Sequence, residues 1–125
     1  MMTKIMECKL IQPVMVEKKD TIVTVAQKMV AEKVKHVIVV ENQMPVGIVS
    51  MHDIVTRLVA QDKDARVVTA ADIMTHPIDS LEESMSIEHA FMHMVKKNVF
   101  FMPITREGKL VGLLPFSNQV KAGTC

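Results

Sequence analysis

The sequence predicts an α/β fold, of the α+β type, built from two copies of one β-α-β-β-α unit. The first observation is an internal repeat, because residues 46–53 and 111–118 share an apolar run containing a glycine, 65 positions apart. The second is a helical period of apolar residues ahead of each predicted pair of strands. A repeat of this kind takes priority over any short local motif.

Each copy begins with a short extended segment, at 13–16 or 77–81, and a helix follows. Apolar residues recur there at i, i+3, i+4, i+7 and i+8, which places them along one helical face. They are Ile22, Val25, Ala26, Met29 and Val30 in the first copy and Ile87, Ala90, Phe91, Met94 and Val95 in the second. Thr21 and Ser86 stand directly before these stripes and are predicted N-caps.

Two strands and a second helix complete each copy. Residues 37–40 and 100–104 are continuous apolar runs, as expected for strands that are buried on both faces. A polar turn separates each run from a second strand, which ends at the glycine motif. The closing helices are predicted at 51–60 and at 116 to about 122.

The repeat divides the chain into predicted domains at 5–60 and 73–123, joined by a charged linker at 61–72. A unit of about 50 residues buries too little surface to be stable alone. We therefore expect the two copies to pack sheet against sheet as one body with pseudo-twofold symmetry.

The composition excludes several classes of function. The 15 basic and 14 acidic side chains give a net charge of +1, and the only aromatic residues are four Phe, so we expect neither nucleic acid nor a membrane as partner. No apolar run is long enough to suggest a membrane span. Cys8 and Cys125 lie near opposite ends and fit no metal spacing, and we expect a cytoplasmic location.

We predict no enzyme activity and no catalytic residues, because the chain has no Ser-His-Asp order, nucleophile elbow or phosphate-binding loop. The twelve methionines are expected to fill the core. His89 and His93 share a helical face, but no third ligand accompanies them. We therefore predict no metal site.

Ser50 and Asp53, at the end of the first glycine motif, allow two interpretations. Their spacing at a strand-to-helix junction is that of a capping box, with Asp in place of Glu, which would only stabilise the helix. Alternatively, the helix start binds an anion and the carboxylate accepts hydrogen bonds from the hydroxyls of a ribose. Lys35 and His36, just before the central strand, would then supply positive charge. Both interpretations fit the sequence.

Taken in order, the duplicated motifs resemble a tandem pair of CBS domains, the regulatory module named after cystathionine β-synthase and also called a Bateman module. The resemblance is carried by residues 37–40 (VIVV) and 47–53 (GIVSMHD) in the first copy and by 102–104 (MPI) in the second, and it covers about residues 5–123. It implies clefts between the repeats that bind AMP, ADP, ATP, S-adenosylmethionine or a related adenosyl compound, without an obligatory cofactor. The implied first site has Val14, Val34 and Ile48 around the adenine, Lys35 and His36 beside the cleft, Asp53 at the ribose and Ser50 at the ribose or phosphate.

The second copy departs from the family pattern at its polar positions. Pro115 stands where a Ser or Thr is expected and has no hydroxyl, and Asn118 stands where an Asp is expected and is uncharged. The implied second site consists of Val99, Phe100, Leu113, Pro115 and Asn118. We predict that this site is degenerate and that each chain has one competent site.

These inferences together predict a non-catalytic regulatory protein that senses an adenosyl ligand. The ligand would favour one arrangement of the repeats, and a protein target in trans or the second subunit would respond to that arrangement. A homodimer is expected, because symmetric dimers are the commonest assembly and apolar residues are exposed on the predicted helices. The alternative is a dimerising scaffold that binds no small ligand.

Overall fold

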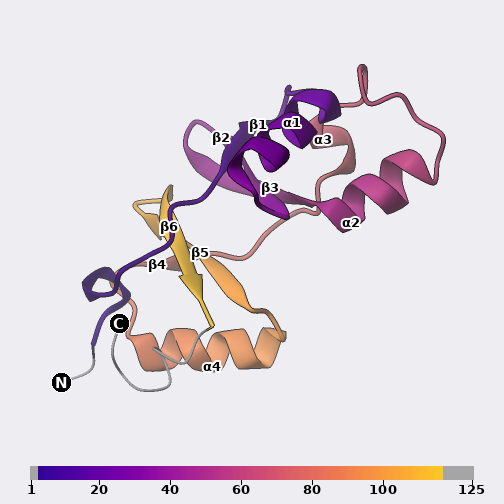
Figure 1. Ribbon diagram of the computed structural model, residues 1–125. Coiled ribbons are helices and arrows are strands. Elements are labelled where there is room, and N and C mark those ends of the chain that lie inside the picture. Colours follow the sequence, from indigo (N-terminus) through magenta and orange to yellow (C-terminus); the bar gives the residue numbers. More distant parts are fainter. Residues whose placement is uncertain (1–2, 117–125) are drawn as a thin grey trace. The chain divides into compact units, whose positions relative to one another are not determined.

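The computed structural model describes residues 3–116 of the chain (Figure 1). Its elements are the 3₁₀ turn η1 (Ile5–Glu7), β1 (Met15–Glu17), α1 (Ile22–Glu32), β2 (His36–Glu41), β3 (Met44–Ser50), α2 (Met51–Ile54), the π-helical turn η2 (Val55–Val59), α3 (Ala70–Ile73), β4 (Leu81–Glu82), α4 (Ile87–Lys97), β5 (Phe101–Arg106) and β6 (Lys109–Pro115). The predicted mixed fold with a repeated unit is confirmed. The closing helix predicted from residue 116 lies almost wholly outside the described residues.

The two three-stranded sheets have the same topology, with orders β1-β2-β3 and β4-β5-β6. In each sheet the first strand is parallel to the middle strand and the last is antiparallel to it. Each antiparallel pair changes register at the same place, between Val39 and Val40 in one sheet and between Ile104 and Thr105 in the other. The backbone therefore preserves the repeat in detail, including its irregularity.

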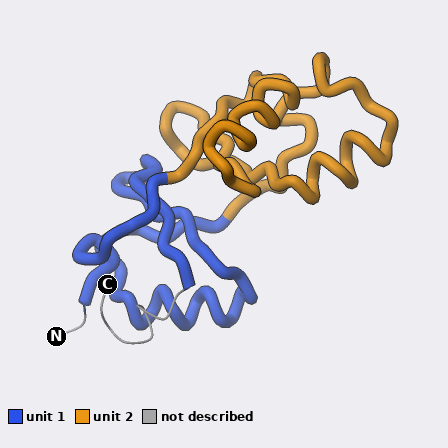
Figure 2. The backbone as a smooth tube through the Cα atoms, in the orientation of Figure 1, with its two compact units in different colours: residues 1–12, 79–125 blue, residues 13–78 orange. Residues whose placement is uncertain are grey.

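The chain forms two compact units, and they do not follow the repeat boundaries (Figure 2). Residues 13–78 form one unit, and residues 1–12 join 79–125 in the other. The amide of Ile5 donates to the carbonyl of Met85 at 2.9 Å, so the N-terminal segment is held by the second copy. The domain boundaries at 5–60 and 73–123 stay a prediction about the repeat, whereas packing follows this interleaved division.

Both long helices begin as predicted. The side chain of Thr21 accepts a hydrogen bond from the amide of Thr24, and that of Ser86 accepts one from the amide of His89. Each helix ends at a residue with left-handed backbone geometry, Lys33 in α1 and Asn98 in α4. These caps satisfy backbone groups that the helix itself leaves unpaired.

The apolar stripes on these helices are only partly buried. In α1, Ile22 and Val25 are at most 1% exposed and pack against the sheet, but Val30, on the same predicted stripe, is 78% exposed. In α4, Ile87, Ala90 and Met94 are buried, whereas the corresponding Val95 is exposed. The stripe is wider than the surface of the sheet that it covers, so its outer edge remains at the surface.

The helix predicted over residues 51–60 is regular only in its first turn. Helix α2 gives way to the π-helical turn η2, in which the amide of Ala60 donates to the carbonyl of Val55 at 2.8 Å. Such turns hold one extra residue and often occur beside functional sites. Among the described residues, no helix is both long and apolar enough to cross a membrane.

One glycine in each sheet allows a neighbouring segment to approach closely. A Cβ on Gly47 would lie 2.4 Å from the sulfur of Met74, and a Cβ on Gly112 would lie 2.6 Å from the Cβ of Leu10. Neither position has room for a side chain, because atoms are never this close without displacement. The glycine that defines the repeat is thus explained by close packing, because Met74 lies against Gly47 in β3 and Leu10 lies against Gly112 in β6.

Glu82 stabilises the turn between β5 and β6 in the second sheet. Its carboxylate accepts hydrogen bonds from the amide of Gly108 at 3.1 Å, from the hydroxyl of Thr105 at 3.0 Å and from the amide of Glu107 at 3.2 Å. These bonds hold the pKa of Glu82 below its ordinary value, and the bond from Gly108 contributes most. They favour the charged carboxylate in the folded state.

Glu82→Gln is therefore expected to reduce stability at neutral pH and to matter less in acid. A carboxylate with a lowered folded pKa stabilises the fold above its unfolded pKa of about 4.3, and this is lost as the pH falls through the folded value. Urea midpoints of both proteins at pH 7 and at about pH 3 test this. Glu17→Gln is the control, since the register partner of Glu17 is Val40, which has no hydroxyl. A stability difference that stays constant with pH would contradict the assignment.

Candidate functional site

The candidate site lies at the carboxyl end of β3, where Ser50 and Asp53 form the predicted capping box. The hydroxyl of Ser50 accepts from the amide of Asp53 at 3.1 Å, and Oδ2 of Asp53 accepts from the amide of Ser50 at 2.9 Å. The Ser50 hydroxyl also donates to Oδ2 at 2.9 Å. One carboxylate oxygen is thus fully used in starting α2, and the capping interpretation of these two residues is realised.

The other oxygen of the carboxylate, Oδ1, has looser neighbours. The hydroxyl of Thr75 donates to it at 3.4 Å, near the limit for a hydrogen bond, and Nε of Arg57 lies 3.8 Å away. Asp53 is only 7% exposed, yet Thr75 is an exposed residue. The carboxylate is therefore sheltered by the protein while Oδ1 faces a side chain at the surface.

The two basic residues predicted for the site lie at the same end of the sheet. His36 is the register partner of Ser50, and the amide of Met51 donates to the carbonyl of Lys35 at 3.0 Å. Both Lys35 and His36 are exposed. The structure thus brings the backbone of Lys35, His36, Ser50 and Asp53 to one end of the sheet, although Lys35 precedes β2 and the others come from β2, β3 and α2.

The three predicted apolar residues are more dispersed. Ile48 is half-buried in β3, and its backbone exchanges hydrogen bonds with Thr75. Val34 and Val14 pack against the core of the same unit. The carbonyl of Val14 accepts from the amide of Ile38 in β2, so the middle strand separates it from Ile48. Of the three, only Ile48 lies within a strand, two residues before Ser50.

The second copy reproduces the backbone of this site without its chemistry. Phe101 is the register partner of Pro115, and the amide of Phe116 donates to the carbonyl of Phe100 at 2.7 Å, as Met51 does to Lys35. The remaining predicted members lie as follows: Phe100 is 77% exposed, Val99 packs against the core, Leu113 pairs with Ile11, and Asn118 falls outside the described residues. No polar side chain of residues 99–116 takes the place of Ser50.

Thr75 and Arg57 were missed by reasoning from sequence. Arg57 follows Asp53 by four residues, a spacing at which opposite charges on a helix meet, so this pair could have been found. Thr75 lies within the second predicted domain, 73–123, yet in the structure it belongs to the unit 13–78. Nothing local in the sequence shows that this segment pairs with β3.

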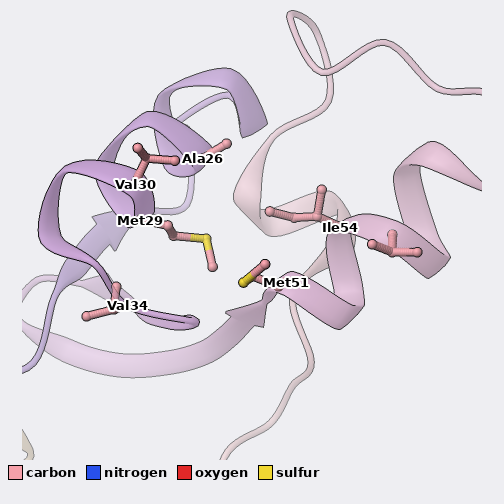
Figure 3. Close-up of a pocket in the computed structure, with 7 residues that line it drawn as sticks. Ala26, Met29, Val30, Val34, Met51 and Ile54 are labelled. Carbon is pink, nitrogen blue, oxygen red and sulfur yellow. The ribbon is translucent and has the colours of Figure 1, made fainter.

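An apolar groove of about 350 Å³ lies beside the site, between α1 and the start of α2 (Figure 3). Figure 3 shows the side chains of Met29 and Met51 pointing toward one another across it. Its lining consists of Ala26, Met29, Val30, Val34, Met51, Ile54 and Val55. Polar side chains do not line this groove, so it is suited to apolar contacts.

The histidines of α4 do not form a metal centre in the described part of the chain. Nε2 of His93 lies 2.6 Å from Oδ2 of Asp79. Residues 3–116 contain no group of three or more His, Cys, Asp or Glu side chains placed to hold a metal ion. The contact between His93 and Asp79 ties α4 to the segment that leads into β4.

The comparison with known proteins agrees with the repeated fold. The family model for the CBS domain matches residues 2–60 and 70–117. The uncharacterized protein MK0525 of Methanopyrus kandleri is 36% identical over 97 residues, which are 76% of this chain and 50% of that protein. The chain therefore spans half the length or less of the curated relatives it matches.

Two solved structures are similar over nearly the whole chain. Hypoxic Response Protein I with two coordinated zinc ions has a TM-score of 0.81 at 21% identity, covering 97% of this chain and 98% of that one. The CBS domain protein PAE2072 from Pyrobaculum aerophilum, complexed with AMP, has a TM-score of 0.77 at 25% identity, covering 97% of both chains. Since the family model matches most of the chain in two copies, the chain belongs to the CBS domain family and carries this domain twice.

Proposed function

We propose that this protein is a non-catalytic sensor that binds an adenosyl ligand at Ser50 and Asp53 and passes the signal on through a shift in conformation. Proteins with paired CBS domains are in general regulatory modules rather than catalysts. Each chain would hold one such ligand, because only the first copy has the necessary side chains. The ligand shifts the population of conformations by as much as its affinities for them differ.

The observation that carries this proposal is the half-used carboxylate of Asp53. Oδ2 is occupied by the capping box, but Oδ1 makes only a 3.4 Å contact with the hydroxyl of Thr75 and can accept a stronger bond from a sugar hydroxyl. The backbone of Lys35 and His36 lies at the same end of the sheet as Ser50, where the ammonium of Lys35 can supply positive charge for a phosphate. AMP in the complex of PAE2072 supports a ligand of this class.

The proposal is tested by calorimetric titration of the protein with AMP, ATP, S-adenosylmethionine and NADH. We expect one of these ligands to bind at one site per chain, and at about 100 times its Kd to stabilise the fold by roughly 2.7 kcal/mol. Two equal sites per chain would contradict the assignment of the second copy as degenerate. No binding by any of the four would refute the adenosyl sensor.

The second candidate function is a dimerising scaffold without a small ligand, and the apolar groove favours it. Val30, Met51 and Val55 expose 78, 54 and 57% of their surface around this groove. Contiguous apolar surface of this kind is typical of protein interfaces. A second copy of the chain is a suitable occupant, because in an isologous dimer the same surface occurs on both partners.

Val30→Lys is expected to convert a dimer of the protein into monomers, because a charge would be buried where apolar side chains meet. Sedimentation velocity of the wild type and the variant at equal concentration measures this. Thr24→Lys, on the exposed surface of the same helix, is the control and should leave the oligomeric state unchanged. A wild type that is monomeric at micromolar concentration would contradict the scaffold.

A further inference from the structure

The guanidinium of Arg57 connects the candidate site to the end of α3 and the residue that follows it. Its Nη1 donates to the carbonyls of Ile73 at 3.0 Å and Met74 at 3.2 Å. The next residue, Thr75, exchanges backbone hydrogen bonds with Ile48 in β3, at 2.8 and 3.0 Å. The segment 73–75 is thus fastened on one side by an arginine and on the other by a strand.

This arrangement determines which oxygen of Asp53 is accessible. Ser50 donates twice to Oδ2, so that oxygen has little capacity left for a ligand. Oδ1 faces the hydroxyl of Thr75 at 3.4 Å and Nε of Arg57 at 3.8 Å. The hydroxyl of Thr75 therefore occupies the position from which a ligand hydroxyl would donate to Oδ1. Arg57 holds the segment that carries Thr75 and so fixes the distance between this position and the carboxylate.

The second copy lacks every member of this polar network. Ile11 pairs with Leu113 as Thr75 pairs with Ile48, and it brings no hydroxyl. At the 65-residue offset the sequence has Pro115 for Ser50, Asn118 for Asp53 and Ala122 for Arg57, the last two outside the described residues. The four polar residues of the first copy are all replaced together, as expected if they act as one unit.

We infer that Arg57 is a positioning residue of the ligand site, which holds the segment 73–75 so that Oδ1 of Asp53 accepts a sugar hydroxyl in place of the hydroxyl of Thr75. This inference rests on the proposed function, because it concerns the same site. Arg57 makes no contact with the ligand in this arrangement. It acts through Asp53 and Thr75, and its removal should weaken only the part of binding that depends on the sugar hydroxyls.

The test compares AMP with 2′,3′-dideoxy-AMP, which lacks both sugar hydroxyls. In Arg57→Gln we expect the affinity for AMP to fall roughly tenfold, as for loss of one well-placed charged hydrogen bond, with little change for the dideoxy compound. Arg57→Lys should restore part of the preference, because an ammonium can still reach one carbonyl. In a double-mutant cycle, Arg57→Gln and Asp53→Asn should be non-additive.

Arg66→Gln is the matched control, because Arg66 lies in the same unit and its guanidinium pairs with Asp64. It should leave the preference for AMP over the dideoxy compound unchanged. A purely structural role of Arg57 would weaken both ligands equally, so an unchanged ratio of the two affinities in Arg57→Gln overturns the inference.

Failure of the proposed function is recognised separately, as a wild type that binds neither nucleotide, and the ligand role of Arg57 falls with it. Whether Arg57 fixes the segment 73–75 is then measured by hydrogen exchange in the ligand-free protein. Arg57→Gln should accelerate exchange at the amides of Ile48 and Thr75, which bond to each other's carbonyls. Unchanged exchange at both amides would show that Arg57 does not position this segment.

Discussion

Asp53→Ala is expected to abolish binding of the adenosyl ligand and to lower the free energy of unfolding by about 1–2 kcal/mol. The first effect follows from loss of Oδ1, the oxygen with capacity for a sugar hydroxyl. The second follows from loss of the capping box, in which Oδ2 accepts from the amide of Ser50. Calorimetric titration and urea unfolding of the same preparation measure the two effects separately.

The structure offers a matched control for this variant in Asp72. The carboxylate of Asp72 accepts from the amide of Thr69 at 2.9 Å and completes a capping box at the start of α3, in the same unit. The bond from Thr69 lowers the pKa of Asp72 and so stabilises its charged form. Asp72→Ala should destabilise the protein to a similar degree and leave binding intact. If Asp53→Ala also bound the ligand normally, Asp53 would be a helix cap and nothing more.

Gly112→Ala is expected to lower the free energy of unfolding by about 1–3 kcal/mol, a typical effect of overpacking. The new Cβ would lie 2.6 Å from Cβ and 2.8 Å from Cδ1 of Leu10. The Cβ of a side chain cannot move without the backbone, so the N-terminal segment would have to shift away from β6. Urea unfolding, with hydrogen exchange at Ile11 and Leu113 as a local readout, measures this.

Gly47→Ala is the companion variant, and its effect should be at the lower end of the same range. Its Cβ would meet the sulfur and Cγ of Met74, which belong to a flexible side chain that can change its rotamer. The order of the two effects follows from the distance of the clashing atom from the backbone. A larger loss in Gly47→Ala than in Gly112→Ala would contradict this explanation.

Features determined by neighbouring residues could be predicted from sequence. The N-caps Thr21 and Ser86, the central strands and the capping box of Ser50 all depend on residues within one turn or one strand. The order of the elements could also be predicted, because the same pattern occurs twice in the chain. The family resemblance then identified the end of the first glycine motif as the candidate site.

Features determined by distant segments could not be predicted in this way. The predicted domains 5–60 and 73–123 place each opening segment, before residue 13 and before residue 78, with the copy that follows it in the chain. In the structure, Thr75 pairs with Ile48 of the first copy and Ile11 with Leu113 of the second. Edge pairing of this kind depends on backbone hydrogen bonds, which carry no side-chain pattern. For the same reason the role of Thr75 beside Asp53 could not be inferred from sequence.

The interleaved division of the chain also bears on the order in which a nascent polypeptide can acquire its structure. Every residue of the unit 13–78 has been synthesised once residue 78 has been added, whereas the partners of the N-terminal segment come later, since Ile5 bonds to Met85 and Ile11 to Leu113. Domains generally fold as units during translation, starting from the N-terminus. Here residues 5–11 are synthesised before the unit 13–78, but their partners Met85 and Leu113 are synthesised after it, so this unit can be complete before the N-terminal segment is in place.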